Sequence, residues 1–185
     1  CWGNDNWGQL GSGSGAFDSY VPTLVDGGHL WSDLDANAYT TYGITTSGKL
    51  YGWGYGQNGR LGGGTTNDSF TPKAILSSLT FSEVSAGRNH FIAVTTGGVT
   101  YVGGSNNYGQ LGDGTTTDAL TPKVLNHSFT AIGAGSYHTC GIKSGGQVYC
   151  WGLNDKGQLG DGTTTDRLVP TASISNVAYE KVDGG

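Results

Sequence analysis

The chain has 185 residues, of which 35 are glycine, and only 12% are charged. A formal charge of -5, with 9 scattered Lys and Arg residues, leaves no basic stripe for nucleic-acid phosphates, and no apolar run approaches membrane-spanning length. Gly, Pro, Asn or Thr interrupts every stretch that could form a helix. The sequence therefore predicts an all-β, turn-rich protein that neither binds nucleic acid nor inserts into a membrane.

In chain order, residues 1–30 begin inside an expected third strand, turn through a glycine-rich corner and end in an outer strand around Pro22. Residues 31–80, 81–128 and 129–176 each contain two strands joined by small residues, a glycine turn, a third strand, a corner and an outer segment. Residues 177–185 are predicted to start a further unit with its first strand. The whole chain is interpreted as one domain built from a repeat.

The repeat is marked by a Gly-x-Leu-Gly corner that returns about every 50 residues, at Gly8–Gly11, Gly59–Gly62, Gly109–Gly112 and Gly157–Gly160. After each corner comes an Asp-x-x-x-Pro ending, at Asp18, Asp68, Asp118 and Asp166. Because proline lacks an N–H donor, it belongs on an edge strand, which places these endings in the outermost strand of a sheet. Four antiparallel strands per period indicate the blades of a β-propeller.

The run AGSYHTCGIKSGGQVYCWGLNDKGQLGDGTTTDRLVP, residues 134–170, resembles the regulator of chromosome condensation repeat. The resemblance extends over nearly the whole chain and implies part of a seven-bladed propeller, similar to secreted bacterial-type members with paired cysteines. Three whole blades and a fourth divided between the termini are expected. The departures are Asp35-Ala36-Asn37 in the first copy, Thr40 where later copies have histidine, and Gly103 where others have tryptophan.

Two cysteines are predicted to form a disulfide, because Cys140 and Cys150 fall opposite each other on a hairpin. The equivalent pairs of the two preceding whole blades, Tyr42 with Gly52 and Ile92 with Val102, hold no cysteine, so the residues are replaced as a pair; two buried free thiols are the alternative. A disulfide implies an oxidising, extracellular location. Cys1 aligns with Cys150, and its expected partner lies upstream of the sequence. Asn67 and Asn126 begin possible N-glycosylation triplets.

The glycine-rich corner could be a phosphate loop or a calcium loop, but it lacks the lysine and following helix of the first and the alternating acids of the second. Elements that recur in every copy indicate folding rather than function. The repeated aspartates are therefore interpreted as turn caps, and the repeated Trp2, Trp53 and Trp151 as packing between blades. No catalytic residues, metal ligands or cofactor are predicted.

What varies between copies is the pair of loops at one end of each blade, and these loops contain aromatic and arginine residues of the kind enriched in protein interfaces. The predicted protein-binding residues are Trp7, Tyr39, Arg88, Tyr108 and Tyr137.

The leading hypothesis is a non-catalytic extracellular propeller that binds a protein partner or self-assembles at a cell surface. One alternative is a secreted enzyme inhibitor, since secreted propellers similar to this chain block β-lactamases. A second, implied by the family resemblance, is guanine-nucleotide exchange on a small GTPase.

Overall fold

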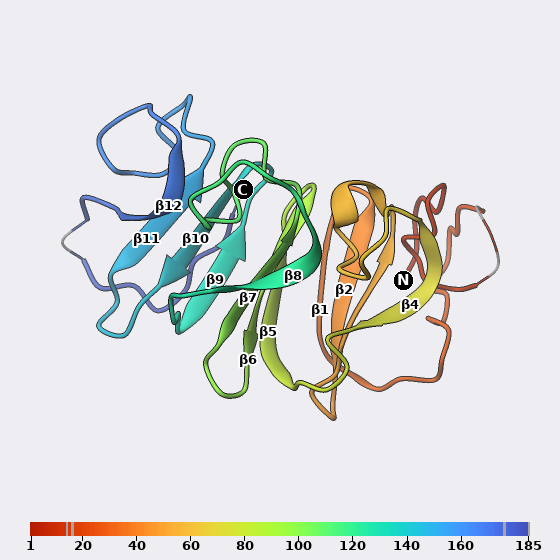
Figure 1. Cartoon of the computed structure of the whole chain (residues 1–185). Helices are drawn as coiled ribbons and strands as arrows, with labels where there is room; N and C mark the ends of the chain where they lie inside the picture. Colours follow the sequence, from red (N-terminus) through yellow and green to blue (C-terminus); the bar gives the residue numbers. More distant parts are fainter. Residues whose placement is uncertain (14, 16, 176, 185) are drawn as a thin grey trace.

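The computed structural model describes residues 1–13, 15, 17–175 and 177–184, and its strands form three antiparallel sheets (Figure 1). The first sheet contains β1 (Trp31–Asn37), β2 (Thr40–Thr45), β3 (Leu50–Gly54) and β4 (Ser69–Ile75). The second contains β5 (Phe81–Ala86), β6 (His90–Thr95), β7 (Thr100–Gly104) and β8 (Ala119–Leu125). The third contains β9 (Ala131–Ala134), β10 (His138–Ile142), β11 (Val148–Gly152) and β12 (Arg167–Ala172). A single 3-10 turn, η1 (Gln57–Gly59), is the only helical element in the described part of the chain.

Each sheet is a propeller blade with its strands in chain order, so the prediction of all-β, four-stranded antiparallel blades is confirmed. The outermost strands β4, β8 and β12 contain Pro72, Pro122 and Pro170, where a missing N–H donor breaks no pairing with a further strand. The four predicted Asp caps are also confirmed. Each accepts a backbone N–H from the loop after the third strand: Asp18 from Asp5, Asp68 from Gly56, Asp118 from Asn106 and Asp166 from Asn154.

The blades stack with their first strands adjacent, as contacts between β1 and β5 and between β5 and β9 show. The Ala86 N–H donates to the Asp35 carboxylate over 2.9 Å, and the Ala134 N–H donates to the Ser85 hydroxyl over 3.0 Å. Hydrophobic side chains fill the space between neighbouring blades in two clusters, and burying each large side chain contributes about 1.5–3 kcal/mol. Packing between blades therefore provides the core of this fold.

A hydrogen-bond unit that occurs at two of the corners joins the corner to the following blade. The Trp151 indole donates to the Gln110 carbonyl over 2.9 Å, and the Trp53 indole donates to the Gln9 carbonyl over 3.0 Å. Gly112 lies directly against the Trp151 ring with φ of +72°, so a side chain there would be strained and would overlap the indole. The glycine-rich corner is thus a structural turn that receives the next blade's tryptophan.

The second blade builds this junction differently, because Gly103 replaces the tryptophan. Phe91 occupies the space beside Gly103, and its ring centroid lies 5.0 Å from that of Tyr42. The Tyr42 hydroxyl donates to the carbonyl of Arg60, the residue that stands where the other corners have glutamine. Two aromatic rings from neighbouring blades therefore replace one tryptophan.

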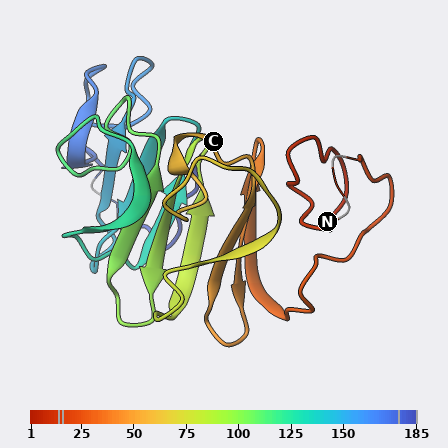
Figure 2. The ribbon, with the colours of Figure 1, turned by 45° about the vertical axis from the view of Figure 1, so that its right-hand side comes forward.

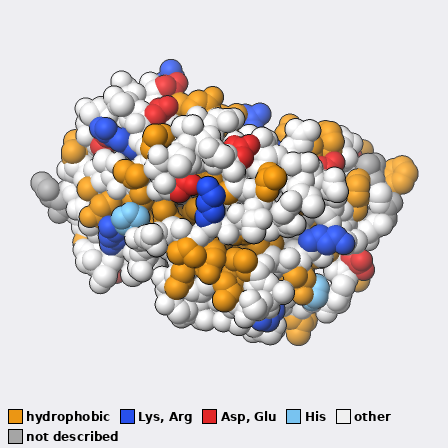
Figure 3. Space-filling view, in the orientation of Figure 1, with side chains coloured by type: hydrophobic (Ala, Val, Ile, Leu, Met, Phe, Trp, Pro, Cys, Tyr) orange, Lys and Arg blue, Asp and Glu red, His pale blue; other side chains and the backbone are white. Residues whose placement is uncertain are grey.

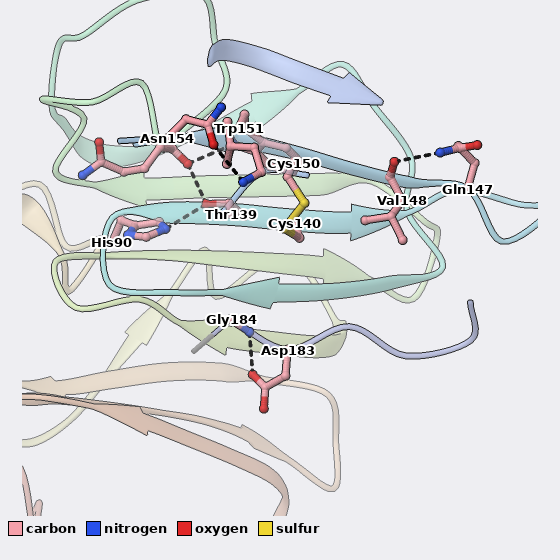
Figure 4. The surroundings of a disulfide bond; sticks show 12 residues. His90, Thr139, Cys140, Gln147, Val148, Cys150, Trp151, Asn154, Asp183 and Gly184 are labelled. Atoms are coloured by element: carbon pink, nitrogen blue, oxygen red, sulfur yellow. Dashed lines mark hydrogen bonds between the residues drawn. A yellow bond between two sulfur atoms is a disulfide. The ribbon is translucent and has the colours of Figure 1, made fainter. Parts of the chain in front are cut away.

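The predicted disulfide joins Cys140 to Cys150 across β10 and β11, where the two residues are direct partners in the register with Cα atoms 4.1 Å apart (Figure 4). Both cysteines are buried and pack with Leu159. Val182, from the C-terminal segment, covers the same cluster. The disulfide thus lies in the hydrophobic layer of the third blade.

The two end segments differ from the expected strands. Among the described residues of 1–30 no strand forms, and the only β-pairing is one bridge between Gly3 and Ser19 (Figure 2). Trp2 is 66% exposed, so its predicted packing between blades is wrong. Residues 177–184 form no strand in their described part, although Asp183 lies against Gly133 of β9, at the side where a further first strand would stack.

Candidate protein-binding surface

The variable loops lie together at one edge of the blades, the upper edge in Figure 1, opposite the hairpin turns between second and third strands. Each blade closes this edge with the same backbone hydrogen bond. The N–H after the third strand donates to the carbonyl in the loop between the first two strands, from Tyr55 to Tyr39, Ser105 to Asn89 and Leu153 to Tyr137. The backbone of this edge is therefore repeated, and only its side chains differ.

Three aromatic rings gather where the N-terminal segment meets the first blade. The centroid of Trp7 lies 4.4 Å from that of Tyr55, and the centroid of Tyr39 lies 6.1 Å from Tyr55 in an edge-to-face arrangement. Such aromatic pairs contribute about 0.5–1.5 kcal/mol each beyond the area they bury. Trp7 and Tyr39 are 37% and 41% exposed, so the pairing fixes the rings without removing them from solvent.

Two arginines continue this cluster toward the second and third blades. The Arg60 guanidinium lies over the Tyr55 ring, 4.8 Å from its centroid, and donates to the Arg88 carbonyl over 3.0 Å. The exposed guanidinium of Arg88 lies 5.6 Å from the centroid of Tyr137. The Tyr137 ring in turn packs against Tyr108, with 5.3 Å between centroids, and Tyr108 is 38% exposed.

These contacts form a single row of side chains, here called the aromatic loop face and consisting of Trp7, Tyr39, Tyr55, Arg60, Arg88, Tyr108 and Tyr137. The structure brings all five predicted binding residues into this row. Their role in binding stays a prediction. Sequence reasoning missed Tyr55 and Arg60. The signal for Arg60 was present, because it replaces the glutamine found at Gln9, Gln110 and Gln158 in the other corners.

Replacement of that glutamine reshapes the loop. In the other copies the glutamine side chain accepts the N–H of the residue two positions earlier, as Gln110 does from Tyr108 over 2.9 Å. Arginine has no acceptor, and Arg60 instead donates to the Gln57 carbonyl over 2.9 Å. The loop then forms the 3-10 turn η1, with Asn58 in the left-handed region at φ of 59°. Burial lowers the pKa of Arg60.

The polar residues around the corners are engaged by the fold. The buried Asn154 side chain accepts the Leu159 N–H and donates to the Thr163 carbonyl, and Asn106 makes the equivalent bonds in the second blade. Asp5 takes this position in the partial copy formed by residues 1–30. Its Oδ1 accepts the Leu10 N–H, but its buried Oδ2 has no hydrogen-bond partner. Burial raises the pKa of Asp5.

His90 belongs to a hydrogen-bonded chain between the second and third blades (Figure 4). Its Nε2 lies 2.8 Å from the Thr139 hydroxyl, which donates to the Gln110 carbonyl over 2.7 Å. Because that hydroxyl uses its proton on the carbonyl, Nε2 must be the protonated nitrogen. Burial lowers the pKa of His90 to about 3, so it is neutral at physiological pH. It is a structural residue in this arrangement.

Four further observations concern the described residues. They contain no group of three or more His, Cys, Asp or Glu side chains that could hold a metal ion. No helix among them is long and apolar enough to cross a membrane. Lys and Arg side chains are spread singly over the face seen in Figure 3. Asn67 and Asn126 are exposed in loops, and their glycosylation stays a prediction.

Comparison with known proteins gives relatives of the same repeat. The chain is 36% identical to the human regulator of chromosome condensation over 62 residues, covering 34% of this chain and 15% of that protein. The structure of yeast Prp20 matches with a TM-score of 0.82 and 21% identity, covering 95% of this chain and 44% of that one. The ectodomain of the receptor kinase CR4 from Physcomitrella patens matches with a TM-score of 0.58 and 18% identity, covering 92% of this chain and 40% of that one. The chain thus spans less than half the length of each of these relatives.

Models of the repeat itself match residues 47–94, 97–142 and 145–182, and a second version matches 31–60 and 129–158. The matches extend over most of the chain, and the repeat's strands, corners and tryptophan positions are those described above. The chain belongs to the regulator of chromosome condensation (RCC1) repeat family.

Proposed function

We propose that this chain is a non-catalytic protein-binding module that acts outside the cell and contacts its partner through the aromatic loop face. The observation that carries the proposal is the row itself. Exposed rings and an arginine from different blades form one row on a scaffold whose loop backbone repeats from blade to blade. Binding energy in protein interfaces concentrates in tyrosine, tryptophan and arginine side chains of this kind.

The row is also preorganised for binding. Each of its rings already contacts a neighbouring ring or guanidinium, so less side-chain entropy is lost when a partner covers them. The backbone beneath is fixed by the repeated hydrogen bonds of the loop edge. A rigid set of half-exposed aromatic residues matches the centre of a protein interface better than a site for a small molecule, which is usually concave and enclosed.

The extracellular part of the proposal rests on the disulfide, because buried disulfides persist in oxidising compartments. The CR4 match supports it further, since that propeller is the ectodomain of a receptor kinase. The non-catalytic part of the proposal rests on the structural hydrogen bonds that the buried polar side chains make. Among the described residues, the Asn106 and Asn154 side chains bond within the loops of their own blades and His90 bonds to Thr139 of the next blade, so these polar groups are engaged by the fold.

A second candidate function comes from the Prp20 match. Prp20 binds Gsp1p and histones, and another structure holds it bound to Kap60. Nucleotide exchange on a small GTPase is therefore the competing proposal, and it differs in location, since it requires a reducing intracellular compartment. Enzyme inhibition by the same loops would be one form of the leading proposal, with an enzyme as the captured partner.

Site-specific photo-crosslinking tests the proposal. A photoreactive phenylalanine analogue is placed at Tyr39 or Tyr108, and a matched control at Val99, which is 42% exposed near the hairpin turn at the opposite edge. Illumination on the producing cells should yield a discrete protein adduct from both loop positions and none from Val99. Adducts of equal yield from Val99, or a small intracellular GTPase as the adduct, would reject the proposal.

A further inference from the structure

Two arginines that do not repeat meet on the aromatic loop face. Arg60 stands where the other corners have glutamine, and Arg88 stands where the other loops have Ala38 and Ser136. They are far apart in sequence, yet the Arg60 guanidinium donates to the Arg88 carbonyl over 3.0 Å. In a repeat protein, two independent departures that converge on one point mark a feature that the fold itself does not need.

Neither arginine has a carboxylate partner. The ion pairs among the described residues join Lys123 to Asp113, Lys156 to Asp155 and Arg167 to Asp161, and none includes Arg60 or Arg88. The nearby Asp68 and Asp118 are occupied as caps that accept the N–H groups of Gly56 and Asn106. Asp68 offsets part of the charge of Arg60 without forming an ion pair with it. The two arginines are therefore a local pair of like charges without a salt-bridge partner, on a chain with a formal charge of -5.

The two arginines have different roles in this pair. Arg60 is only 3% exposed, and its guanidinium is held between the Tyr55 ring and the Arg88 backbone. It therefore holds the loop that contains Arg88 in place and adds a buried positive charge beneath the surface. Arg88 is exposed and lies over the Tyr137 ring, which leaves the edges of its guanidinium free to meet a partner. A guanidinium supported by an aromatic ring is a site that matches a planar carboxylate.

We propose that the aromatic loop face binds an acidic segment of its protein partner, with a Glu or Asp carboxylate on Arg88 and neighbouring apolar or aromatic side chains on Tyr108 and Tyr137. This inference rests on the proposed function and names the chemistry of the partner. The negative charge of the rest of the chain does not oppose it strongly, because charges beyond about 8 Å are screened at physiological ionic strength.

Fluorescence polarisation with a defined probe tests the inference. The probe is a labelled peptide in which glutamates flank one tyrosine, and its neutral counterpart has glutamine in place of each glutamate. The intact chain should bind the glutamate peptide more tightly than the glutamine peptide, and the difference should shrink as ionic strength rises. Arg88→Gln should weaken binding of the glutamate peptide about tenfold and leave the glutamine peptide unchanged.

Two variants serve as controls. Lys156→Gln removes an exposed charge at the same edge, in the third blade's loop, and should change neither affinity. Arg60→Gln restores the residue that the other corners carry, so it should fold, as thermal melting can verify. Because Arg60 positions Arg88, this variant should reduce the preference for glutamate over glutamine, an effect that a purely structural role would not produce.

Three results would overturn the inference: absence of saturable binding of the glutamate peptide, equal affinity for both peptides, or an affinity that does not depend on Arg88. Tighter binding of a short DNA duplex with the same dependence on Arg88 would also overturn it, since phosphate would then be the ligand. A photo-crosslinked partner at Tyr39 together with any of these results would leave the proposed function standing and reject only the acidic partner.

Discussion

Acid should weaken the junction between the second and third blades through His90. This side chain is fully buried, donates through Nε2 to Thr139, and has a pKa lowered by burial to about 3 from the ordinary 6.5. Because the folded state resists protonation, the stabilising contribution is complete above the unfolded pKa and is lost as pH falls toward the folded one. At about pH 4.5, about two pH units below the ordinary pKa of histidine, this corresponds to roughly 3 kcal/mol of lost unfolding free energy.

The assay is denaturant unfolding at about pH 7 and about pH 4.5 for the natural chain and for His90→Gln. Glutamine retains a donor toward Thr139 but does not titrate in this range, so the variant should lose less stability on acidification, by roughly 3 kcal/mol. Titrating groups that do not interact with His90, such as Glu83 with its raised pKa, contribute equally to both proteins and cancel in the comparison. Identical acid sensitivity of the two proteins would refute the buried, neutral state of His90.

Three further changes test the scaffold. Replacing Cys140 and Cys150 together by alanine should lower the unfolding free energy by about 3 kcal/mol, since the bond closes a loop with a sequence separation of 10; denaturant titration without reductant measures this, and an unchanged midpoint would contradict it. Asp5→Asn should raise stability by about 1 kcal/mol at neutral pH, because the amide can donate where Oδ2 has no partner. Because the pKa of Asp5 is raised in the folded state, its carboxylate destabilises the fold only once the pH is high enough to ionise it. The stability advantage of Asp5→Asn should therefore shrink under acid, and an advantage that grew under acid would contradict this explanation. Gly112→Ala should cost about 2 kcal/mol or more by thermal melting, because its φ is +72° and Trp151 fills the space; a melting temperature equal to that of the natural chain would count against the corner's role.

The fold was largely predictable because the repeat provides its own internal comparison. Positions that return in every copy proved to be structural: the Asp caps, the prolines of the outer strands and the corner leucines, which are all 5% exposed or less. The disulfide could be predicted because both cysteines replace non-cysteine residues together and the hairpin register sets them opposite each other. Each of these features depends on residues within a single repeat, so it can be predicted from the sequence.

The missed features depend on contacts between distant segments. Nothing near Arg60 in the sequence indicates that its guanidinium would lie on Tyr55 and bond to the Arg88 backbone, since that contact exists only once two blades are stacked. The recurrence of tryptophan at Trp2, Trp53 and Trp151 predicts packing between blades, yet Trp2 is 66% exposed while the other two are fully buried. The sequence pattern within one repeat therefore predicts the blade, while the side-chain contacts at its edges depend on the neighbouring blades.

The most direct test of the central claim is the affinity of the photo-crosslinked partner for variants of the aromatic loop face. Tyr39→Ser combined with Tyr108→Ser removes two exposed rings without altering the repeated backbone bonds beneath them, and Val99→Ser is the matched change at the opposite edge. The double variant should bind the partner more than about tenfold more weakly, while Val99→Ser binds normally. Its melting temperature should fall only modestly, because two surface aromatic pairs are lost, and should stay well above the assay temperature. Equal affinity of the natural chain and the double variant would contradict the assignment of this surface to partner binding.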